Sequence, residues 1–164
     1  MKLAVLAAAA ALVIAAPAWA QALRLSGVAG QTATVTLAEL AALPHVHVEV
    51  KQNGQAHAFD GVLLGDLLAK VGAPRGEAIR GAELASAVRF TSVDGYQVVL
   101  ALADTDSLTR KGRVLIADHD GGEALKPGEG PFRLVIEDDL KPARSARQIE
   151  RIEVLRLATT PVKP

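Results

Sequence analysis

The most informative segment of the chain is Gly121–Leu155, which reads GGEALKPGEGPFRLVIEDDLKPARSARQIERIEVL. It opens with a glycine-rich turn and a Gly-Pro-x-Arg element, and the apolar run Phe132–Ile136 that follows predicts a buried strand. An acidic loop, Glu137–Asp139, comes next. Three arginines then form a basic cluster: Arg144, Arg147 and Arg151. Because an alternating strand closes the segment, the order predicts two strands joined by a charged loop.

The first twenty residues have the features of a secretory signal peptide. Lys2 supplies a positive charge, Leu3–Ala16 is an unbroken apolar run, and Ala18-Trp19-Ala20 offers the small-x-small pattern that signal peptidase accepts. The apolar run is short for a bilayer-spanning helix, which needs about 20 residues. An uncleaved N-terminal anchor is the alternative. We expect cleavage after Ala20, and hence a periplasmic or secreted protein with no transmembrane span after cleavage.

Charge and aromatic content argue against several classes of partner. The chain has 18 basic and 18 acidic residues, and the signal peptide takes one lysine with it, so the exported part carries one net negative charge. This balance favours neither nucleic acid nor an anionic membrane surface. Few rings remain to stack on bases or sugars: Phe59, Phe90, Tyr96 and Phe132. The chain contains no cysteine, so no disulfide stabilises the fold.

The sequence predicts only short helices. Thr36 and Glu39 have the spacing of a capping box, and the helix that they start must end before Pro44. The clearest helix is predicted over Gly61–Val71, where the leucines share one face at helical spacing. One further helical turn is predicted at Asp104–Arg110.

Strand signals dominate the remainder. Asn53-Gly54 and Asp94-Gly95 are tight-turn dipeptides that predict two hairpins. The predicted strands are Leu23–Leu25, His45–Val50, Ala56–Phe59, Val88–Val93, Tyr96–Leu102, Val114–Ala117, Phe132–Ile136 and the alternating strand that ends near Leu155. Seven or eight short strands and two or three short helices, without βαβ alternation, predict a strand-dominated mixed α+β fold. We assign residues 21–158 to one domain and 159–164 to a frayed tail.

Six segments, in this order, resemble the sulfite oxidase-type molybdopterin-binding domain. They are Thr36–Pro44 (TLAELAALP), Phe59–Leu68 (FDGVLLGDLL), Asp94-Gly95-Tyr96, Val114–Leu125 (VLIADHDGGEAL), Gly130–Ile136 and Ala143–Val154. The resemblance extends from about Gly30 to Leu155, and it implies the same strand-rich fold and a molybdopterin cofactor.

The resemblance also implies which residues hold that cofactor. Arg133 occupies the position of the family arginine that binds the phosphate and the pterin, and Ser145 and Arg147 lie in the contact stretch that follows it. Asp94 corresponds to an acid that bonds a pterin nitrogen. The chemistry suits these roles, because a guanidinium offers a planar fork of donors to phosphate oxygens and a serine can donate one more hydrogen bond.

The chain departs from the family pattern at the metal. The family's enzymes ligate molybdenum partly through a cysteine, which would fall within Val50–Asn53, where this chain has VKQN. A histidine or tyrosine is common five residues before the arginine, and Gly128 stands there. We therefore assign no catalytic residue and no metal ligand. The chain is an oxidoreductase of the molybdopterin-dependent family if it is active, but sulfite oxidation by the family's route is not expected.

Three functions follow from these observations. The leading hypothesis is an exported molybdopterin-binding oxidoreductase-family domain with an unassigned substrate and a redox or membrane-bound partner protein. The alternative is a non-catalytic binding or partner module that keeps the fold without the cofactor. A third hypothesis is a metal carrier that uses His45 and His47, two residues apart on one strand face.

The arginines also have simpler interpretations. Arg133 could be a strand-end residue paired with Glu137 or Asp138, and the basic cluster could balance the acidic loop in solvent. Asp94 could serve the hairpin turn alone, because aspartate followed by glycine suits the backbone of such turns.

Overall fold

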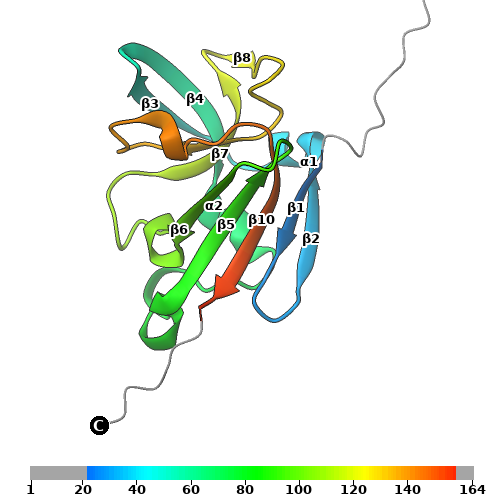
Figure 1. Ribbon diagram of the computed structural model, residues 1–164, viewed down its shortest axis with the longest axis vertical. Coiled ribbons are helices and arrows are strands. Elements are labelled where there is room, and N and C mark those ends of the chain that lie inside the picture. The colour runs from blue at the N-terminus through cyan, green and yellow to red at the C-terminus, as the bar shows by residue number, and fades with distance from the viewer. Residues whose placement is uncertain (1–21, 158–164) are drawn as a thin grey trace, which may run out of the picture.

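The computed structural model describes residues 22–157, which form two β-sheets with short helices (Figure 1). The predicted signal peptide (1–20) and tail (159–164) lie outside these residues. The strands are β1 (Ala22–Ser26), β2 (Thr32–Thr36), β3 (Val46–Gln52), β4 (Gln55–Leu63), β5 (Ser86–Ser92), β6 (Gln97–Ala101), β7 (Val114–Asp120), β8 (Glu123–Ala124), β9 (Arg133–Ile136) and β10 (Ile149–Arg156). The helices are α1 (Leu37–Ala41) and α2 (Leu64–Ala69), with 3₁₀ turns η2 (Gly76–Ala78), η3 (Gly81–Ala85), η4 (Leu102–Thr105) and η5 (Pro142–Arg144).

The first sheet has the strand order β2-β1-β10-β5-β6. Its neighbours are antiparallel except for β1 and β10, which run parallel. The second sheet has the order β3-β4-β7-β8, and β9 also pairs with β7. The α+β, strand-dominated fold class predicted from the sequence is confirmed.

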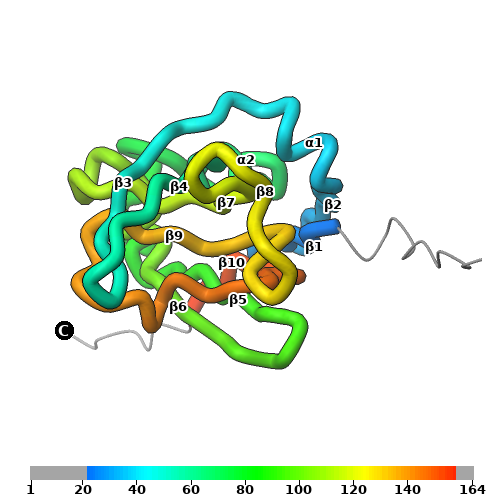
Figure 2. The backbone as a smooth tube through the Cα atoms, turned by 90° about the horizontal axis from the view of Figure 1, so that it is seen from above, coloured from blue at the N-terminus to red at the C-terminus, as the bar shows by residue number. Residues whose placement is uncertain are grey.

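Strand β9 connects the two sheets. One edge pairs with β7, with Arg133 opposite Ala117. On the other edge, the Leu134 amide donates to the Ala146 carbonyl (2.8 Å) and the Ile149 amide donates to the Phe132 carbonyl (2.9 Å). Figure 2 shows β9 running between β7 and β10. The segment that leads into β10 is therefore tied directly to the second sheet.

Two hydrophobic clusters use opposite faces of the second sheet. Val114 and Ile116 of β7 belong to the large core shared with the first sheet, whereas Leu115 and Ala117 pack in a smaller cluster. The smaller cluster contains Val48, Val50, Phe59, Leu115, Ala117 and Val135. Because successive side chains of a strand point to opposite faces, the apolar part of β7, Val114–Ala117, is buried on both sides.

Several local predictions are confirmed. Thr36 caps α1 by accepting from the Glu39 amide, and the Glu39 carboxylate accepts from the Thr36 amide, which completes the capping box. Asn53 and Gly54 have positive φ angles of 51° and 83°, as a tight hairpin turn between β3 and β4 requires. The hairpin at Asp94-Gly95 joins β5 to β6.

Other predictions were wrong in detail. Strand β2 was missed, because Thr36 was taken only as a helix cap. The predicted helix Gly61–Val71 begins at Leu64, since Gly61–Leu63 instead extend β4 along β7. The helical turn expected at Asp104–Arg110 is divided between the end of the 3₁₀ turn η4 and a separate turn in which the Asp106 carbonyl accepts from the amides of Thr109 and Arg110.

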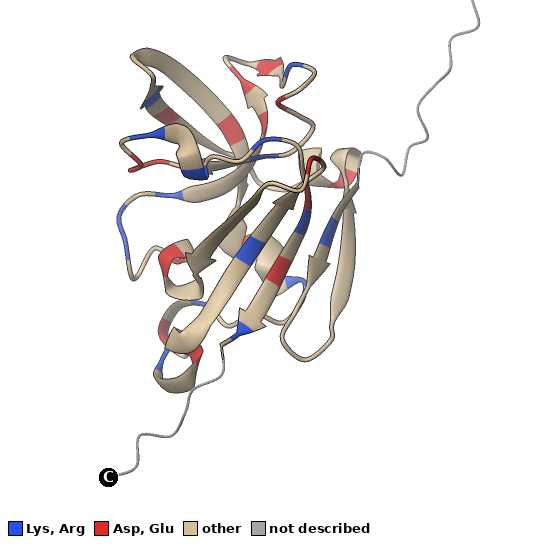
Figure 3. Cartoon of the chain, in the orientation of Figure 1, with Lys and Arg blue, Asp and Glu red and all other residues tan. Residues whose placement is uncertain are grey.

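Blue and red residues are neighbours on β1, β10 and β5 of the first sheet (Figure 3). Arg24 pairs with Glu150 at 3.0 Å, and Arg89 pairs with Glu153 at 2.9 Å. Within residues 22–157, no helix is long and apolar enough to cross a membrane.

Candidate functional site

An open pocket of about 450 Å³ lies beside the start of β9. Its walls come from the β5–β6 hairpin, the turn before β9, and the segment from η5 to β10. The lining residues include Ser92, Asp94, Tyr96, Gly128, Arg133, Ala143, Ser145, Arg147 and Gln148. The four residues predicted to bind a cofactor, Asp94, Arg133, Ser145 and Arg147, thus line one pocket. Its volume is in the range of about 300–1,000 Å³ that is usual for small-molecule sites.

Arg133 is the innermost charged residue of the pocket. Its side chain is 2% exposed, and its guanidinium carbon lies 4.7 Å from the centre of the Phe59 ring. Nη2 donates a hydrogen bond of 2.8 Å to Oε1 of Gln52. Burial lowers the pKa of Arg133, while the charge of Glu129 raises it and that of Arg147 lowers it further. A guanidinium nevertheless stays protonated in proteins, so a buried positive charge lies at this wall.

Nε of Arg133 is buried and has no hydrogen-bond partner among the described residues. A buried donor without a partner costs free energy, about 1–3 kcal/mol when its desolvation is uncompensated. The cost is recovered when an acceptor reaches the group. Arg133, one of the residues that line the pocket, therefore retains an unused donor.

Gln52 was not singled out from the sequence. It ends β3 within Val50–Asn53, the stretch where the family's cysteine was expected, and it is buried. Its Nε2 donates to Oγ of Ser145 at 3.3 Å, so one amide links Ser145 to Arg133. The alternation that placed Val48 and Val50 on the inner face also predicts the inner face for Gln52, two residues further on.

Ser145 and Arg147 differ in exposure. Ser145 is buried, and its hydroxyl accepts from Gln52 but donates to no acceptor among the described residues. The Arg147 side chain is 56% exposed, although its backbone carbonyl is fixed by a 2.6 Å hydrogen bond from Oγ of Ser92. The pocket thus has one recessed hydroxyl donor and one accessible guanidinium.

The β5–β6 hairpin forms the opposite rim. Oδ1 of Asp94 accepts from the Tyr96 amide at 2.9 Å, as its alternative role in the turn predicts, yet Asp94 also lines the pocket. The Tyr96 hydroxyl donates to the Ala143 carbonyl at 2.8 Å. This bond connects the hairpin to η5 across the pocket mouth.

Glu129 was also missed in the sequence. Its carboxylate lies between two arginines, with Oε2 3.3 Å from Nη1 of Arg133 and Oε1 3.5 Å from Nη2 of Arg147. The alternative partners proposed for Arg133 were wrong, because Glu137 pairs with Arg113 and Asp138 with Arg110.

The other two arginines of the basic cluster bind surface carboxylates. Arg144 pairs with Asp139 of the acidic loop at 2.5 Å, and Arg151 lies 3.9 Å from Glu153. The proposed balance between basic cluster and acidic loop thus holds for Arg144, whereas Arg147 turns to the pocket.

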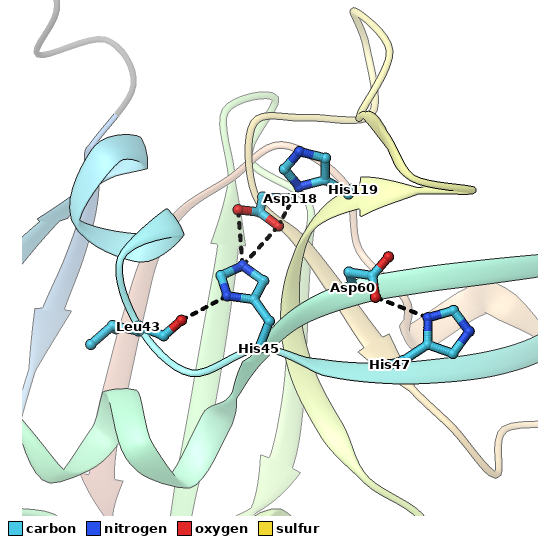
Figure 4. Close-up of polar contacts among 6 residues, drawn as sticks. All are labelled: Leu43, His45, His47, Asp60, Asp118 and His119. Atoms are coloured by element: carbon cyan, nitrogen blue, oxygen red, sulfur yellow. Dashed lines mark hydrogen bonds and ion pairs between the residues drawn. The ribbon is translucent and has the colours of Figure 1, made fainter.

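The histidines are paired with carboxylates rather than with one another (Figure 4). His45 lies 3.2 Å from both oxygens of the buried Asp118, and His47 lies 2.9 Å from Asp60. His119 also contacts Asp118, at 2.9 Å. Within residues 22–157, no group of three or more His, Cys, Asp or Glu is arranged to hold a metal ion. The metal-carrier hypothesis for His45 and His47 therefore gains no support from the geometry.

Over residues 11–160 the chain matches the family described as the oxidoreductase molybdopterin binding domain. The chain belongs to that family. The fold of this molybdopterin-binding domain is similar to the crystal structure of the sulfane dehydrogenase SoxCD from Paracoccus pantotrophus, with a TM-score of 0.63 and 16% identity. The match covers 88% of this chain and 40% of the SoxCD chain, so the domain spans less than half of that protein. No curated protein matches.

The pocket fits the organic part of the family's cofactor, molybdopterin. A phosphate and a polar pterin need donors, and the pocket offers Arg147, the Ser145 hydroxyl and the unpaired Nε of Arg133. It does not supply a thiolate for the metal, because the chain has no cysteine. Gln52 lies in the stretch where that ligand was expected and bonds to Arg133 and Ser145 instead.

Proposed function

We propose that this chain is an exported molybdopterin-binding domain of an oxidoreductase, which holds the cofactor's phosphate and pterin with Arg133, Ser145 and Arg147. The observation that carries the proposal is the buried guanidinium of Arg133 with its unpaired Nε, in a pocket that the other two residues also line. A positive charge kept out of water beside a free donor is suited to an anionic ligand.

Each residue has a distinct role in this proposal. Arg147 is exposed, so it meets the phosphate first, and Arg133 then contacts it from the pocket wall. The Ser145 hydroxyl donates one more bond, while Asp94 accepts from a pterin nitrogen at the opposite rim. When bound, the cofactor supplies redox-active molybdenum held by its own dithiolene sulfurs. Export, a periplasmic or secreted location, and a redox or membrane-bound partner protein are parts of the same proposal.

The substrate is left unassigned. The likeness to a sulfane dehydrogenase supports a redox role in general, but it is a likeness of fold at 16% identity to part of a longer chain.

A second candidate is a non-catalytic binding module that keeps the pocket without redox chemistry. Gln52 favours it, because a buried amide bonded to Arg133 and Ser145 occupies the stretch where the family has its metal-binding cysteine. Such a module binds an anionic ligand in the pocket and holds no molybdenum.

The test is the molybdenum and pterin content of the purified protein. The full chain is expressed in a host that makes the molybdenum cofactor, and molybdenum is measured by mass spectrometry and pterin by fluorescence after oxidation. We expect near-stoichiometric amounts of both in the wild type, large losses in Arg147→Ala and Ser145→Ala, and retention in Arg24→Ala. Arg24 is a suitable control, since it is an exposed arginine paired with Glu150 on the first sheet.

The outcomes separate the two candidates. Pterin without molybdenum supports binding by the pocket but contradicts a redox role, and neither component in a folded protein overturns the cofactor proposal and favours the non-catalytic module. N-terminal sequencing and cell fractionation of the same preparation test export. A protein that still begins at Met1 and is found in the cytoplasmic fraction contradicts export.

A further inference from the structure

Glu129 places a negative charge beside Arg133 and Arg147, two arginines that line the pocket and that an anionic ligand needs. Its two carboxylate oxygens face different arginines, at 3.3 Å from Arg133 and 3.5 Å from Arg147. Both contacts are longer than the roughly 2.7–2.9 Å of a charge-assisted hydrogen bond. The pair Arg113–Glu137 in the same protein reaches 2.6 and 2.8 Å. The Glu129 carboxylate is thus held by charge rather than by close hydrogen bonds.

The backbone of Glu129 is fixed independently of its side chain. Its amide donates to the Lys126 carbonyl at 2.9 Å, and its carbonyl accepts from the Gln148 amide at 3.0 Å. The side chain is 24% exposed, so it has a path into solvent. The carboxylate can therefore leave the two arginines by side-chain rotation while the turn stays in place.

We propose that Glu129 is an internal counter-ion that the ligand's phosphate displaces, so that Glu129 sets the affinity of the pocket for doubly charged phosphate groups. The inference rests on the proposed function, because it concerns the same pocket and the phosphate of the same ligand. Glu129 thus opposes binding of the ligand, whereas Arg133, Ser145 and Arg147 favour it.

Phosphate has two advantages over the carboxylate in this position. It carries up to two negative charges at neutral pH against one, and it has a third oxygen to offer. Glu129 leaves Nε of Arg133 unpaired and does not bond to the Ser145 hydroxyl. A phosphate that replaces the carboxylate can accept from these unused donors. The additional hydrogen bonds favour displacement of Glu129 by phosphate.

The decisive experiment titrates the purified full chain with inorganic phosphate by isothermal calorimetry at low ionic strength. Glu129→Gln keeps the size of the side chain and removes its charge, and we expect it to bind phosphate about tenfold more tightly than the wild type. Glu129→Asp keeps the charge but shortens the reach to both arginines, and we expect an intermediate affinity. Glu123→Gln is the matched control, since Glu123 is exposed on β8 and, unlike Glu129, forms no ion pair with Arg133 or Arg147.

Adding Arg147→Ala to Glu129→Gln should return the affinity to the wild-type value or below. Equal or weaker phosphate binding by Glu129→Gln overturns the inference. The second measurement is the Tm of thermal unfolding with and without phosphate. Phosphate must raise the Tm of Glu129→Gln by more than it raises the Tm of the wild type.

The failure of this inference is distinct from the failure of the proposed function. If Glu129→Gln gains phosphate affinity but neither protein retains pterin when co-expressed with the cofactor pathway, the counter-ion role stands and the ligand is not molybdopterin. If the wild type retains pterin and Glu129→Gln gains no phosphate affinity, the cofactor proposal stands and Glu129 is a structural residue.

Discussion

Arg133 and Gln52, 81 residues apart in the chain, are joined by a 2.8 Å hydrogen bond from Nη2 to Oε1. The bond orients the one buried guanidinium among the described residues and connects it, through the same amide, to Ser145. Gln52 lies in the stretch where the family's metal ligand was expected. In this domain that stretch therefore serves to position an arginine.

Gln52→Leu should lower the free energy of unfolding by about 1–3 kcal/mol, because it leaves a buried guanidinium nitrogen without its acceptor. Urea denaturation measures the change. Gln97→Leu is the comparison, since Gln97 is exposed on β6, and it should cost no more than about 0.5 kcal/mol. Equal costs for the two variants would contradict a structural role for the Gln52 amide.

Gly61→Ala should also destabilise the protein. A Cβ at Gly61 would lie 2.3 Å from the Ile116 carbonyl oxygen and 2.5 Å from Cα of Ala117, at the irregularity in the antiparallel pairing of β4 with β7. We expect a loss of about 1–3 kcal/mol in thermal or urea unfolding. Gly65→Ala in α2 has space, with no atom closer than 3.6 Å, and should stabilise by up to about 1 kcal/mol. The prediction fails if both variants shift stability in the same direction.

His45 should make stability depend on pH near neutrality. Burial lowers the pKa of His45, but the hydrogen bonds to the Leu43 carbonyl and to Asp118, with the charges of Asp118 and Asp60, raise it by more. Both ring nitrogens face acceptors, so the protonated ring satisfies both. Because the folded-state pKa is raised, the stabilisation is present in full below the unfolded-state value and is lost as pH rises through the folded-state value.

The measurement is urea denaturation at about pH 6 and about pH 8, on either side of the ordinary histidine range. The wild type should lose stability between them, and His45→Gln should lose less. His47→Gln is the control, since the His47 side chain is 56% exposed in its contact with Asp60. A pH dependence that survives in His45→Gln assigns the effect to another group.

Glu137 should act in the opposite direction at acidic pH. Its side-chain hydrogen bonds to Arg113 lower the pKa of Glu137 from 4.5, against the effect of burial. The stabilisation is therefore present above the unfolded-state pKa and is lost as pH falls through the lower folded-state value. Glu137→Gln should lower the free energy of unfolding by about 1 kcal/mol at neutral pH. It should also flatten the acid limb of the plot of unfolding free energy against pH, because the group that titrates there is removed. Glu123→Gln should leave that limb unchanged.

Features set by neighbouring residues could be predicted from the sequence. The capping box of Thr36 and Glu39 and the turn at Asn53-Gly54 depend on a few adjacent groups, and both are present as expected. The gathering of Asp94, Arg133, Ser145 and Arg147 around one pocket came from the family resemblance. Periodicity alone could not have brought these segments together.

Features set by tertiary contacts were missed. The leucines after Gly61 suit a helix, but pairing with β7 holds Gly61–Leu63 in a strand, because burial against a neighbour outweighs local propensity. Glu129 lies in a glycine-rich turn, and nothing adjacent shows that its side chain reaches two arginines. Gln52 alone had a usable signal, since it continues the inward alternation of β3.

The pocket joins parts of the chain that are far apart, since Gln52 lies 93 positions before Ser145 and 81 positions before Arg133. Contacts of such long sequence separation form late in folding, because loop closure must precede them. The part of the pocket formed by Arg133 therefore assembles only when β9 brings the two sheets together. A ligand that binds there recognises only the folded chain, so its binding stabilises the protein against unfolding.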